Sequence, residues 1–349
     1  MTARVGSIAA PQFADARRVR RRLAIVVPAF ALVTAAVLVI APTLGSTSIS
    51  LRRAFDPSIP WADNIDAQIF FVARLPRVLA GALVGSTLAA AGVVMQALLR
   101  NPLATPFTLG VSAAAALGAM SAIALHLDLS ALGATAIPVM CFAGAMTGTG
   151  LVYFLATRMR GGLSTNVLLL AGVTLNTLFS ALITFVQYLV DAADWYRTAR
   201  WLLGNLDVSS FNPILAATPL IGLSLVLFAM LPRTLNLLTL GEDVAGSRGV
   251  DVVRAQRIAF LSASLATGAA VSLAGPIGFI GIVVPHLVRL LVGSDHRIVL
   301  PAATLFGAAF LVGCDLIART VMAPIELPVG IVTAIIGGPF FLWLLVRKA

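Results

Sequence analysis

Ten apolar stretches follow one another along this chain, and each is about as long as a helix needs to cross a bilayer. Windows of roughly 17–25 apolar residues span a hydrocarbon core about 30 Å thick. The stretches lie at approximately 23–41, 75–99, 107–125, 131–156, 165–190, 212–231, 255–274, 277–292, 299–319 and 329–346. Composition agrees, because 59% of the residues are hydrophobic and only 11% are charged. We therefore predict an all-α, polytopic membrane protein with about ten transmembrane helices.

The placement of arginine predicts the orientation of these helices, since Lys348 is the only lysine. With ten spans both termini share a side, and that side carries Arg17, Arg18, Arg20, Arg21, Arg22, Arg100, Arg158, Arg160, Arg233, Arg248, Arg254, Arg257, Arg297 and Arg347. The positive-inside rule makes it the cytoplasm. No small-residue cleavage site follows the first apolar run. We predict a cytoplasmic tail at 1–22 and a single transmembrane domain at 23–349.

The net charge of +10 then reflects topology and contact with anionic lipid rather than nucleic-acid binding. Seven arginines fall on or near the outer side, against the rule: Arg52, Arg53, Arg74, Arg77, Arg197, Arg200 and Arg319. They indicate an acidic partner on that face, or ion pairs with Asp191, Asp194 or Asp315 within the chain.

The segment 74–110 carries a small-residue seam. Gly81, Gly85, Ala89 and Gly92 are spaced by four, four and three residues, which places them on one helix face. A neighbouring helix backbone can approach closely there, and Gln96 continues the same face between helices. An ordinary packing seam explains the glycines, but not the arginines that begin the segment.

A polar stripe runs along the span 165–190. Gly172, Asn176, Ser180, Thr184 and Gln187 follow at steps of four, four, four and three, so they form one narrow face. Polar groups in hydrocarbon are costly unless they are satisfied. Hydrogen bonding between helices explains any two of them, whereas five in register favour a cavity or a translocation path.

The longest predicted cytoplasmic loop, 232–254, reads as two short helices joined by a turn and lying across the membrane surface. It holds Glu242, one of only two glutamates, within Leu240-Gly241-Glu242-Asp243. A polar loop needs no function, but such a helix pair also offers a docking surface for a soluble motor domain.

Other classes of function lack their motifs. The three histidines are scattered, so a metal site is not indicated. A secondary transporter normally buries coupling carboxylates at mid-membrane, and Asp315, the chief carboxylate candidate, lies toward one end. An intramembrane hydrolase needs a nucleophile and a base at a recognisable spacing, and a receptor or scaffold has no need of the stripe. No P-loop motif occurs, so any ATP site belongs to a partner.

Many short motifs together resemble those of a known family, in its order and rough spacing. They are RLPR at 74–77, the seam with Gln96, RNPLA at 100–104, Leu109-Gly110, LAG at 170–172, LGE at 240–242, GFIG at 278–281, Pro285-His286, DHR at 295–297 and ELPVG at 326–330. Over about residues 20–348 the chain resembles the permease subunits of ABC importers for iron–siderophore, haem and cobalamin, the type II importers.

This resemblance implies a transport subunit that is not itself an enzyme. It implies a type II permease fold in the bacterial inner membrane, a homodimer, two cytoplasmic ATPase subunits that bind ATP and Mg, and a periplasmic substrate-binding protein. It also implies that this chain holds no cofactor or metal. Siderophore is the favoured cargo by the breadth of the family; haem or cobalamin is the alternative, and a secondary transporter is a more distant one.

The resemblance also implies roles for individual residues. Arg74, Arg77 and Arg319 match outer arginines that accept glutamates of the binding protein. Leu240, Gly241 and Glu242 match the ATPase-coupling loop, and Ser164, Thr165 and Asn166 match the cytoplasmic gate. The stripe residues Asn176, Ser180, Thr184 and Gln187 are our candidates for the translocation path. The sequence departs from the family pattern at Val111-Ser112, after Leu109-Gly110, where many members have a glycine. This departure affects only what the resemblance implies about local packing.

Overall fold

The chain folds into a bundle of helices, as predicted, in a computed structural model that describes residues 9–129, 135–158 and 165–348. Within those residues the elements are α1 (Ala9–Ile40), η1 (Ala41–Thr43), α2 (Leu51–Ala54), α3 (Ile65–Gln68), η2 (Ile69–Arg74), α4 (Leu75–Leu98), η3 (Pro106–Leu109), α5 (Val111–Ala124), α6 (Ala136–Arg158), α7 (Thr165–Leu189), α8 (Ala192–Leu202), α9 (Asn212–Met230), α10 (Pro232–Leu238), α11 (Glu242–Ser247), α12 (Val252–Ala274), α13 (Ile280–Val292), α14 (His296–Thr320) and α15 (Val329–Lys348).

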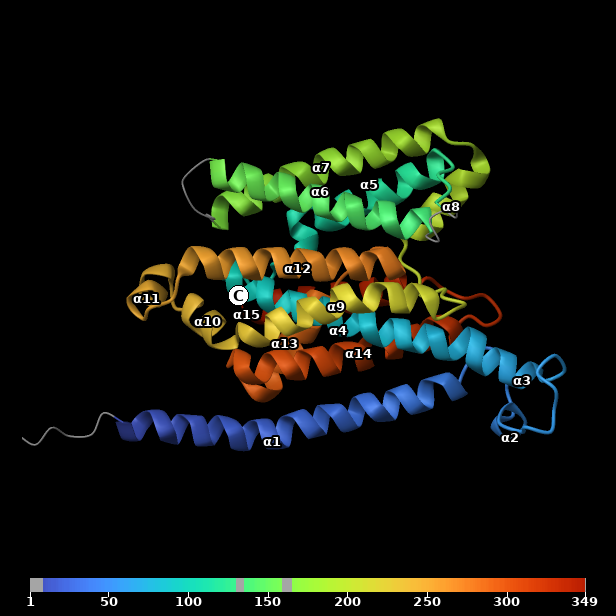
Figure 1. Ribbon diagram of the computed structural model, residues 1–349, viewed down its shortest axis with the longest axis horizontal. Coiled ribbons are helices and arrows are strands. Elements are labelled where there is room, and N and C mark those ends of the chain that lie inside the picture. Colours follow the sequence, from blue (N-terminus) through green and yellow to red (C-terminus); the bar gives the residue numbers. More distant parts are fainter. Residues whose placement is uncertain (1–8, 130–134, 159–164, 349) are drawn as a thin grey trace, which may run out of the picture.

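The long helices lie roughly side by side along the longest axis of the molecule (Figure 1). α5, α6 and α7 form one outer layer, α12, α9 and α4 lie in the middle, and α14 followed by α1 forms the other side (Figure 1). α4 packs against α14, α12, α13 and α9 and is the most buried long helix. α1 lies at the edge and packs mainly against α14.

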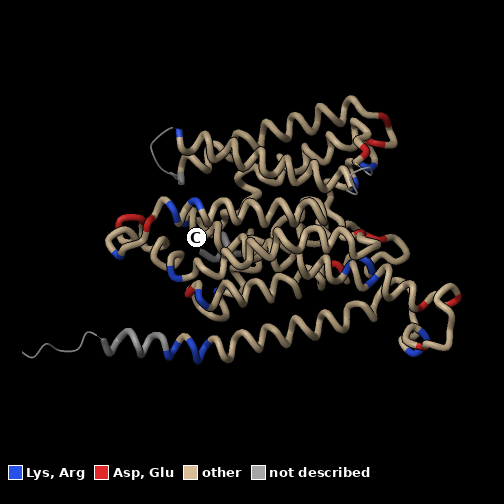
Figure 2. The backbone as a smooth tube through the Cα atoms, viewed as in Figure 1, with Lys and Arg blue, Asp and Glu red and all other residues tan. Residues whose placement is uncertain are grey.

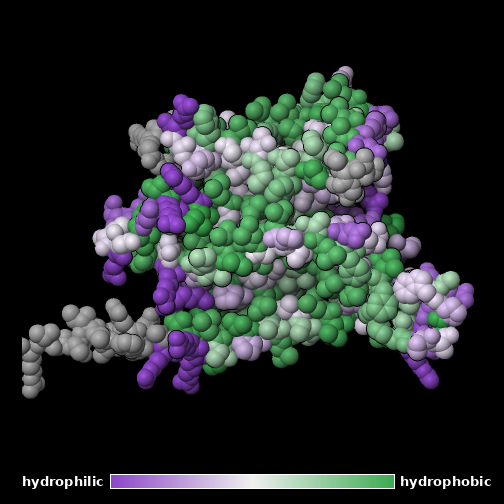
Figure 3. Space-filling view, viewed as in Figure 1, coloured by the Kyte–Doolittle hydropathy of each residue, from purple (hydrophilic) through white to green (hydrophobic). Residues whose placement is uncertain are grey.

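Charged residues gather at the two ends of the bundle and leave a nearly uncharged band between them (Figure 2). On the face seen in Figure 3 the same band is largely hydrophobic. One end carries α10 and α11, and we call it the α11 end; the other carries α2, α3 and α8, and we call it the α8 end (Figure 1). Such an apolar band between two charged ends is the pattern of a protein that crosses a membrane.

The ten predicted spans all correspond to apolar helices, but not all of these are equally long. Seven helices in the described chain are long and apolar enough to cross a membrane, and Val111–Ala124, Ile280–Val292 and Val329–Trp343 are shorter. Two of the three are short because the chain before them is not α-helical. Gly110, with a φ of 77°, precedes α5, and Phe279, with a φ of 67°, precedes α13.

One boundary differs clearly from the sequence prediction. The helix expected to begin at residue 75 continues from Ile65 through α3 and η2 into α4. The added turns are covered by aromatic side chains, since Phe55 packs edge-on against Phe70 and Phe71 with ring centroids 5.2 and 5.4 Å apart. This packing prolongs the helix beyond the apolar band at the α8 end.

The small-residue seam of α4 is where other helices approach most closely. A Cβ built on Gly85 would lie 2.2 Å from the carbonyl oxygen of Gly307 in α14, and one on Gly92 would lie 2.1 Å from that of Gly281 in α13. Gln96 donates a hydrogen bond from Nε2 to the same Gly281 oxygen at 2.9 Å. The predicted seam and the predicted amide between helices are both confirmed.

We expect Gly92→Ala to destabilise the protein, although alanine is the better helix former by about 1 kcal/mol. The new methyl group would meet backbone atoms of α13, which cannot rotate away, and such overpacking typically costs about 1–3 kcal/mol. Gly222→Ala in α9 is the matched control, because nothing lies within 4 Å of its Cβ position. Thermal unfolding in detergent should show a lower midpoint for Gly92→Ala and an unchanged or higher one for Gly222→Ala.

Candidate translocation, coupling and docking sites

The predicted helix pair at the α11 end is present as α10 and α11, joined at Gly241. Gly241 has a φ of 121°, a backbone conformation that only glycine adopts readily. Leu240, just before the turn, is an exposed apolar residue. The turn therefore presents an apolar tip beyond the charged end of the bundle, where a partner can contact it.

Glu242 begins α11 and ties it to two other parts of the chain. Its Oε1 accepts a hydrogen bond from Arg100 Nη2 at 3.3 Å and one from Gln256 Nε2 at 3.2 Å. Arg100 follows α4, and Gln256 is a buried residue of α12. The predicted coupling residue thus joins α11 to the segment after α4 and to α12.

α10 is anchored on the opposite side by Asn236. Its Nδ2 donates to Asp295 Oδ1 at 2.8 Å, and its Oδ1 accepts from the His296 backbone N–H at 2.9 Å. Partial burial acts to raise the pKa of the Asp295 carboxyl, but hydrogen bonds from Arg297 and Asn236 outweigh it and lower that pKa to about 2. Asp295 is therefore ionised at neutral pH and caps the start of α14.

Of the predicted gate residues, Ser164 lies outside the described residues. Thr165 and Asn166 begin α7 at the α11 end, and Asn166 is exposed. Their role as a gate stays a prediction.

The polar stripe of α7 lies on a face that is mostly uncovered in the single chain. α7 buries Leu168, Leu175, Phe179 and Ile183 against the bundle, while Ser180 and Thr184 are exposed and Asn176 and Gln187 are half-buried. Each of the two hydroxyls donates to the carbonyl four residues earlier in α7, at 2.8 and 3.0 Å. Because both hydroxyls are satisfied within the helix, they do not by themselves indicate that this face contacts water.

The two amides of the stripe are different. Asn176 and Gln187 make no side-chain hydrogen bond within the described part of the chain. An unsatisfied amide in hydrocarbon costs several kcal/mol, roughly 4–8 kcal/mol in the driest reference solvent. Asn176 also borders a cavity of about 300 Å³ lined by η3 and by the turn before α13, including Thr105, Thr108 and Phe279. At Asn176 the stripe thus borders a cavity where two segments of the chain, η3 and the turn before α13, are not α-helical.

The three arginines predicted for docking are buried in the single chain at the α8 end. Their exposed fractions are 5% for Arg74, 8% for Arg77 and 3% for Arg319. Arg77 Nε donates to both oxygens of Asp315 at 2.9 and 3.1 Å, and its Nη1 pairs with Glu326 at 2.5 Å. Arg319 lies 3.7 Å from the same Asp315.

The other hydrogen bonds of these arginines reach the segment that follows α1. Arg319 Nη2 donates to the carbonyl of Ala41 at 2.6 Å, and Arg74 donates to the carbonyls of Pro42, Thr43 and Thr47. The arginines therefore hold α4, α14 and the end of α1 together. In this state a partner's carboxylate would have to compete with the chain's own acceptors.

Residues 12–347 match the FecCD transport family. The chain is 39% identical over 306 residues to the hemin transport system permease protein of Yersinia pestis, which covers 87% of this chain and 90% of the relative. It is 44% identical over 273 residues to the cobalamin import system permease protein of Halobacterium salinarum, covering 78% and 72%. A solved metal-chelate type ABC transporter in an inward-facing conformation has 32% identity and a TM-score of 0.79 over 92% of this chain and all of that one.

This chain belongs to the FecCD transport family.

As a FecCD protein it is a multi-pass membrane protein with the permease fold of an ABC importer, as the motifs predicted. Its relatives are transport components and not enzymes.

The sequence did not predict which charged residues pair with one another: Glu326 and Arg77 are 249 residues apart, and Glu242 and Arg100 are 142 apart. The rarity of glutamate could have indicated these pairs, because the chain has only two glutamates and both pair with arginine at an end of the bundle.

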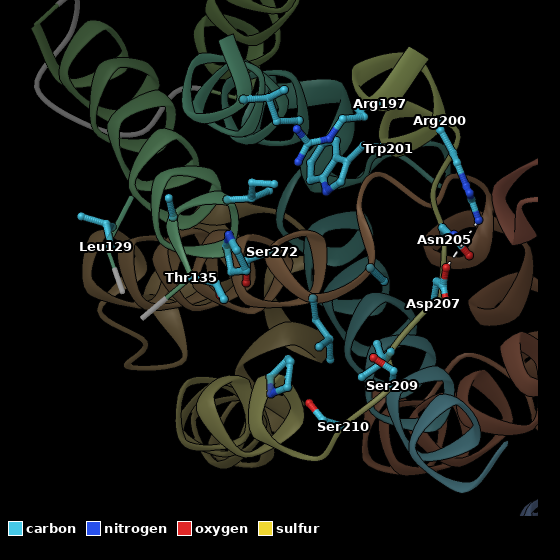
Figure 4. Close-up of a pocket in the computed structure, with 18 of the residues that line it drawn as sticks. Leu129, Thr135, Arg197, Arg200, Trp201, Asn205, Asp207, Ser209, Ser210 and Ser272 are labelled. Atoms are coloured by element: carbon cyan, nitrogen blue, oxygen red, sulfur yellow. Dashed lines mark hydrogen bonds and ion pairs between the residues drawn. The ribbon is translucent and has the colours of Figure 1, made fainter. Parts of the chain in front are cut away.

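The FecCD chain also has an open cavity of about 670 Å³ at the α8 end (Figure 4). Arg197, Arg200 and Trp201 reach it from α8, and Ser272 from α12. Arg200 pairs with Asp207 across its rim at 3.4 Å, and Arg197 pairs with Asp194 at 3.3 Å. The exposed arginines of α8 thus already have carboxylate partners. Arg197 pairs with Asp194, as the sequence left open, whereas Arg200 pairs with Asp207, a partner that the sequence analysis did not name.

We expect Asp315→Asn to destabilise the protein strongly. It leaves Arg77 and Arg319 buried beside a neutral group, and breaking a buried ion pair typically costs about 3–5 kcal/mol. Asp207→Asn is the control, because it removes an exposed pair worth at most about 1 kcal/mol. Unfolding in detergent should separate the two variants, and equal midpoints would show that the Asp315 cluster does not hold the α8 end together.

Proposed function

We propose that this chain is the permease of an ATP-driven importer that carries a chelated metal complex across the inner membrane into the cytoplasm. Two copies form the path, two separate ATPase subunits bind ATP and Mg, and a periplasmic binding protein delivers the cargo. The α11 end, with the start of α1, the end of α15 and most arginines, faces the cytoplasm under the positive-inside rule. The family match over residues 12–347 is the observation that carries the proposal.

The uncovered face of α7 supports a homodimer. Besides Ser180 and Thr184 it exposes large apolar groups, including Val173 and Tyr188. A second copy related by a two-fold axis would cover the apolar groups and double each polar residue around the axis. Amide and hydroxyl groups around such an axis provide hydrogen bonds to a water-filled or cargo-filled path.

The chemistry of the stripe favours an already chelated metal. A bare cation needs several oxygen or nitrogen ligands to replace its water, and carboxylate or imidazole usually supplies them. The stripe offers amides and hydroxyls instead, which suit the organic shell of a metal complex. Ferric siderophore is our favoured cargo, and haem or cobalamin is the alternative, in line with what the Yersinia and Halobacterium relatives are named for.

We further propose that the cluster at the α8 end receives the binding protein. Arg74, Arg77 and Arg319 supply three positive charges there against Asp315 and Glu326, so the cluster carries one net positive charge. An incoming carboxylate would balance it and exchange with Glu326, whose side chain is 44% exposed. Such docking should weaken as salt rises.

Purification of the tagged chain under mild conditions tests the proposed importer. We expect an ATPase with a P-loop to co-purify in equal amount with the permease. Mass spectrometry of the material that the cognate binding protein retains should show an organic metal complex and so name the cargo. Transport that proceeds with the tagged chain alone, driven by an ion gradient, would instead establish a secondary transporter.

Thiol labelling tests the path. In a background with Cys141 and Cys314 changed to alanine, Ser180→Cys should react with a charged, water-soluble thiol reagent in at least one nucleotide state. Leu178→Cys is the matched control, because it is also exposed on α7 but points about 160° away from Ser180. We expect it to face lipid. Reaction at position 178 with none at position 180 would place the path elsewhere.

A further inference from the structure

The carboxylate of Glu242 joins three elements at one atom. Its Oε1 lies 3.3 Å from Arg100 Nη2 and 3.2 Å from Gln256 Nε2. Gln256 is 3% exposed, so removal of its acceptor would leave a buried amide donor, which typically costs about 1–3 kcal/mol. The Arg100 pair is more exposed, with 43% and 44% of the two side chains accessible, and such pairs add little to stability.

The segment that Arg100 begins is a fixed turn. Arg100 has a φ of 48°, in the left-handed region that non-glycine residues seldom occupy. The next residue, Asn101, donates from its backbone N–H to the Gln96 carbonyl at 3.1 Å. Its side chain accepts from the Leu103 N–H at 2.9 Å, and its carbonyl accepts from Ala104 at 3.1 Å. Movement of Arg100 is therefore passed to residue 104 and beyond.

The far end of the same segment rests on the backbone of α7. A Cβ built on Gly172 would lie 2.6 Å from the Cα of Leu109, and one on Gly110 would lie 3.2 Å from the backbone nitrogen of Asn176. Glycine at both positions brings the two backbones into direct contact, with the Leu109 side chain packed beside Gly172. Gly172 and Asn176 are the first two residues of the polar stripe.

We propose that residues 99–110 are a connecting segment that transmits movement of the α10–α11 pair to the stripe of α7. In this inference Arg100 and Gln256 are positioning residues that act through Glu242: Arg100 links α11 to the connecting segment, and Gln256 links it to α12. The inference rests on the proposed function, because it takes the α10–α11 pair as the ATPase contact. It adds which residues carry the coupling inside the membrane domain.

The test measures how strongly nucleotide changes the labelling rate of the thiol introduced by Ser180→Cys, in the permease with its ATPase bound. Arg100→Gln should retain the ATPase and the unfolding midpoint, since the lost pair is partly exposed. It should nevertheless lower the ratio of labelling rates with and without nucleotide by about fivefold or more, the usual lower range of coupling between sites. Arg257→Gln is the matched control: it removes an equal charge one residue after Gln256, from a side chain that is exposed and forms no ion pair with the described residues.

Charge reversal separates coupling from surface charge. Arg100→Glu should abolish the nucleotide response, and the double variant with Glu242→Arg should restore part of it, because the pair is re-formed with the charges exchanged. A full response in Arg100→Gln, an equal loss in Arg257→Gln, or loss of the ATPase from Arg100→Gln would each overturn the inference while the proposed function stands. A labelling rate that nucleotide leaves unchanged in the wild-type background would overturn the inference, whereas an ATPase that fails to co-purify with the permease would count against the proposed function.

Discussion

The contact of α4 with α13 and α14, where backbone meets backbone, is the constraint on which the rest of the structure depends. Lipid is as apolar as leucine, so helices in a bilayer are held together by close van der Waals contact rather than by exclusion from water. Gly85 and Gly92 allow that contact because a side chain at either position would occupy the space of a neighbouring carbonyl. With α4 fixed in this way, its two ends define where Arg77 and Arg100 stand, and hence both charged clusters.

Two breaks in helical structure lie beside the buried middle of α4. One precedes α5 at Gly110, and the other precedes α13 at Phe279. Non-helical backbone at membrane depth is tolerated only inside protein or beside a water-filled cavity. η3, which ends just before Gly110, and Phe279 border the same cavity as Asn176, so polar groups lie inside the bundle beside these breaks. A transport protein uses such breaks because they bring backbone polar groups to its interior.

Much of this architecture was readable from the sequence, because membrane crossing requires long apolar runs and glycine spacing marks close helix contact. The seam of α4, Gln96 and the α10–α11 pair were all predicted from local patterns. Contacts between residues that are far apart in the sequence were not predictable in the same way. Positive-inside counting located Arg77 at an end of the bundle but said nothing of Glu326, since no local pattern links residues 249 positions apart. The docking, gating and coupling roles rest on resemblance and the path role on the polar stripe of α7, and all of them stay predictions.

The edge position of α1 bears on the order in which the protein is made. α1 is synthesised before α14, yet it packs mainly against that helix, far along the chain. Thr34 Oγ1 lies 2.9 Å from the carbonyl of Leu305, 271 residues later, and Ala41 receives the guanidinium of Arg319. At a synthesis rate of about 5–20 residues per second, some tens of seconds separate the synthesis of α1 from that of α14. During biogenesis α1 must therefore remain in the bilayer on its own hydrophobicity until α14 has been synthesised and can pack beside it.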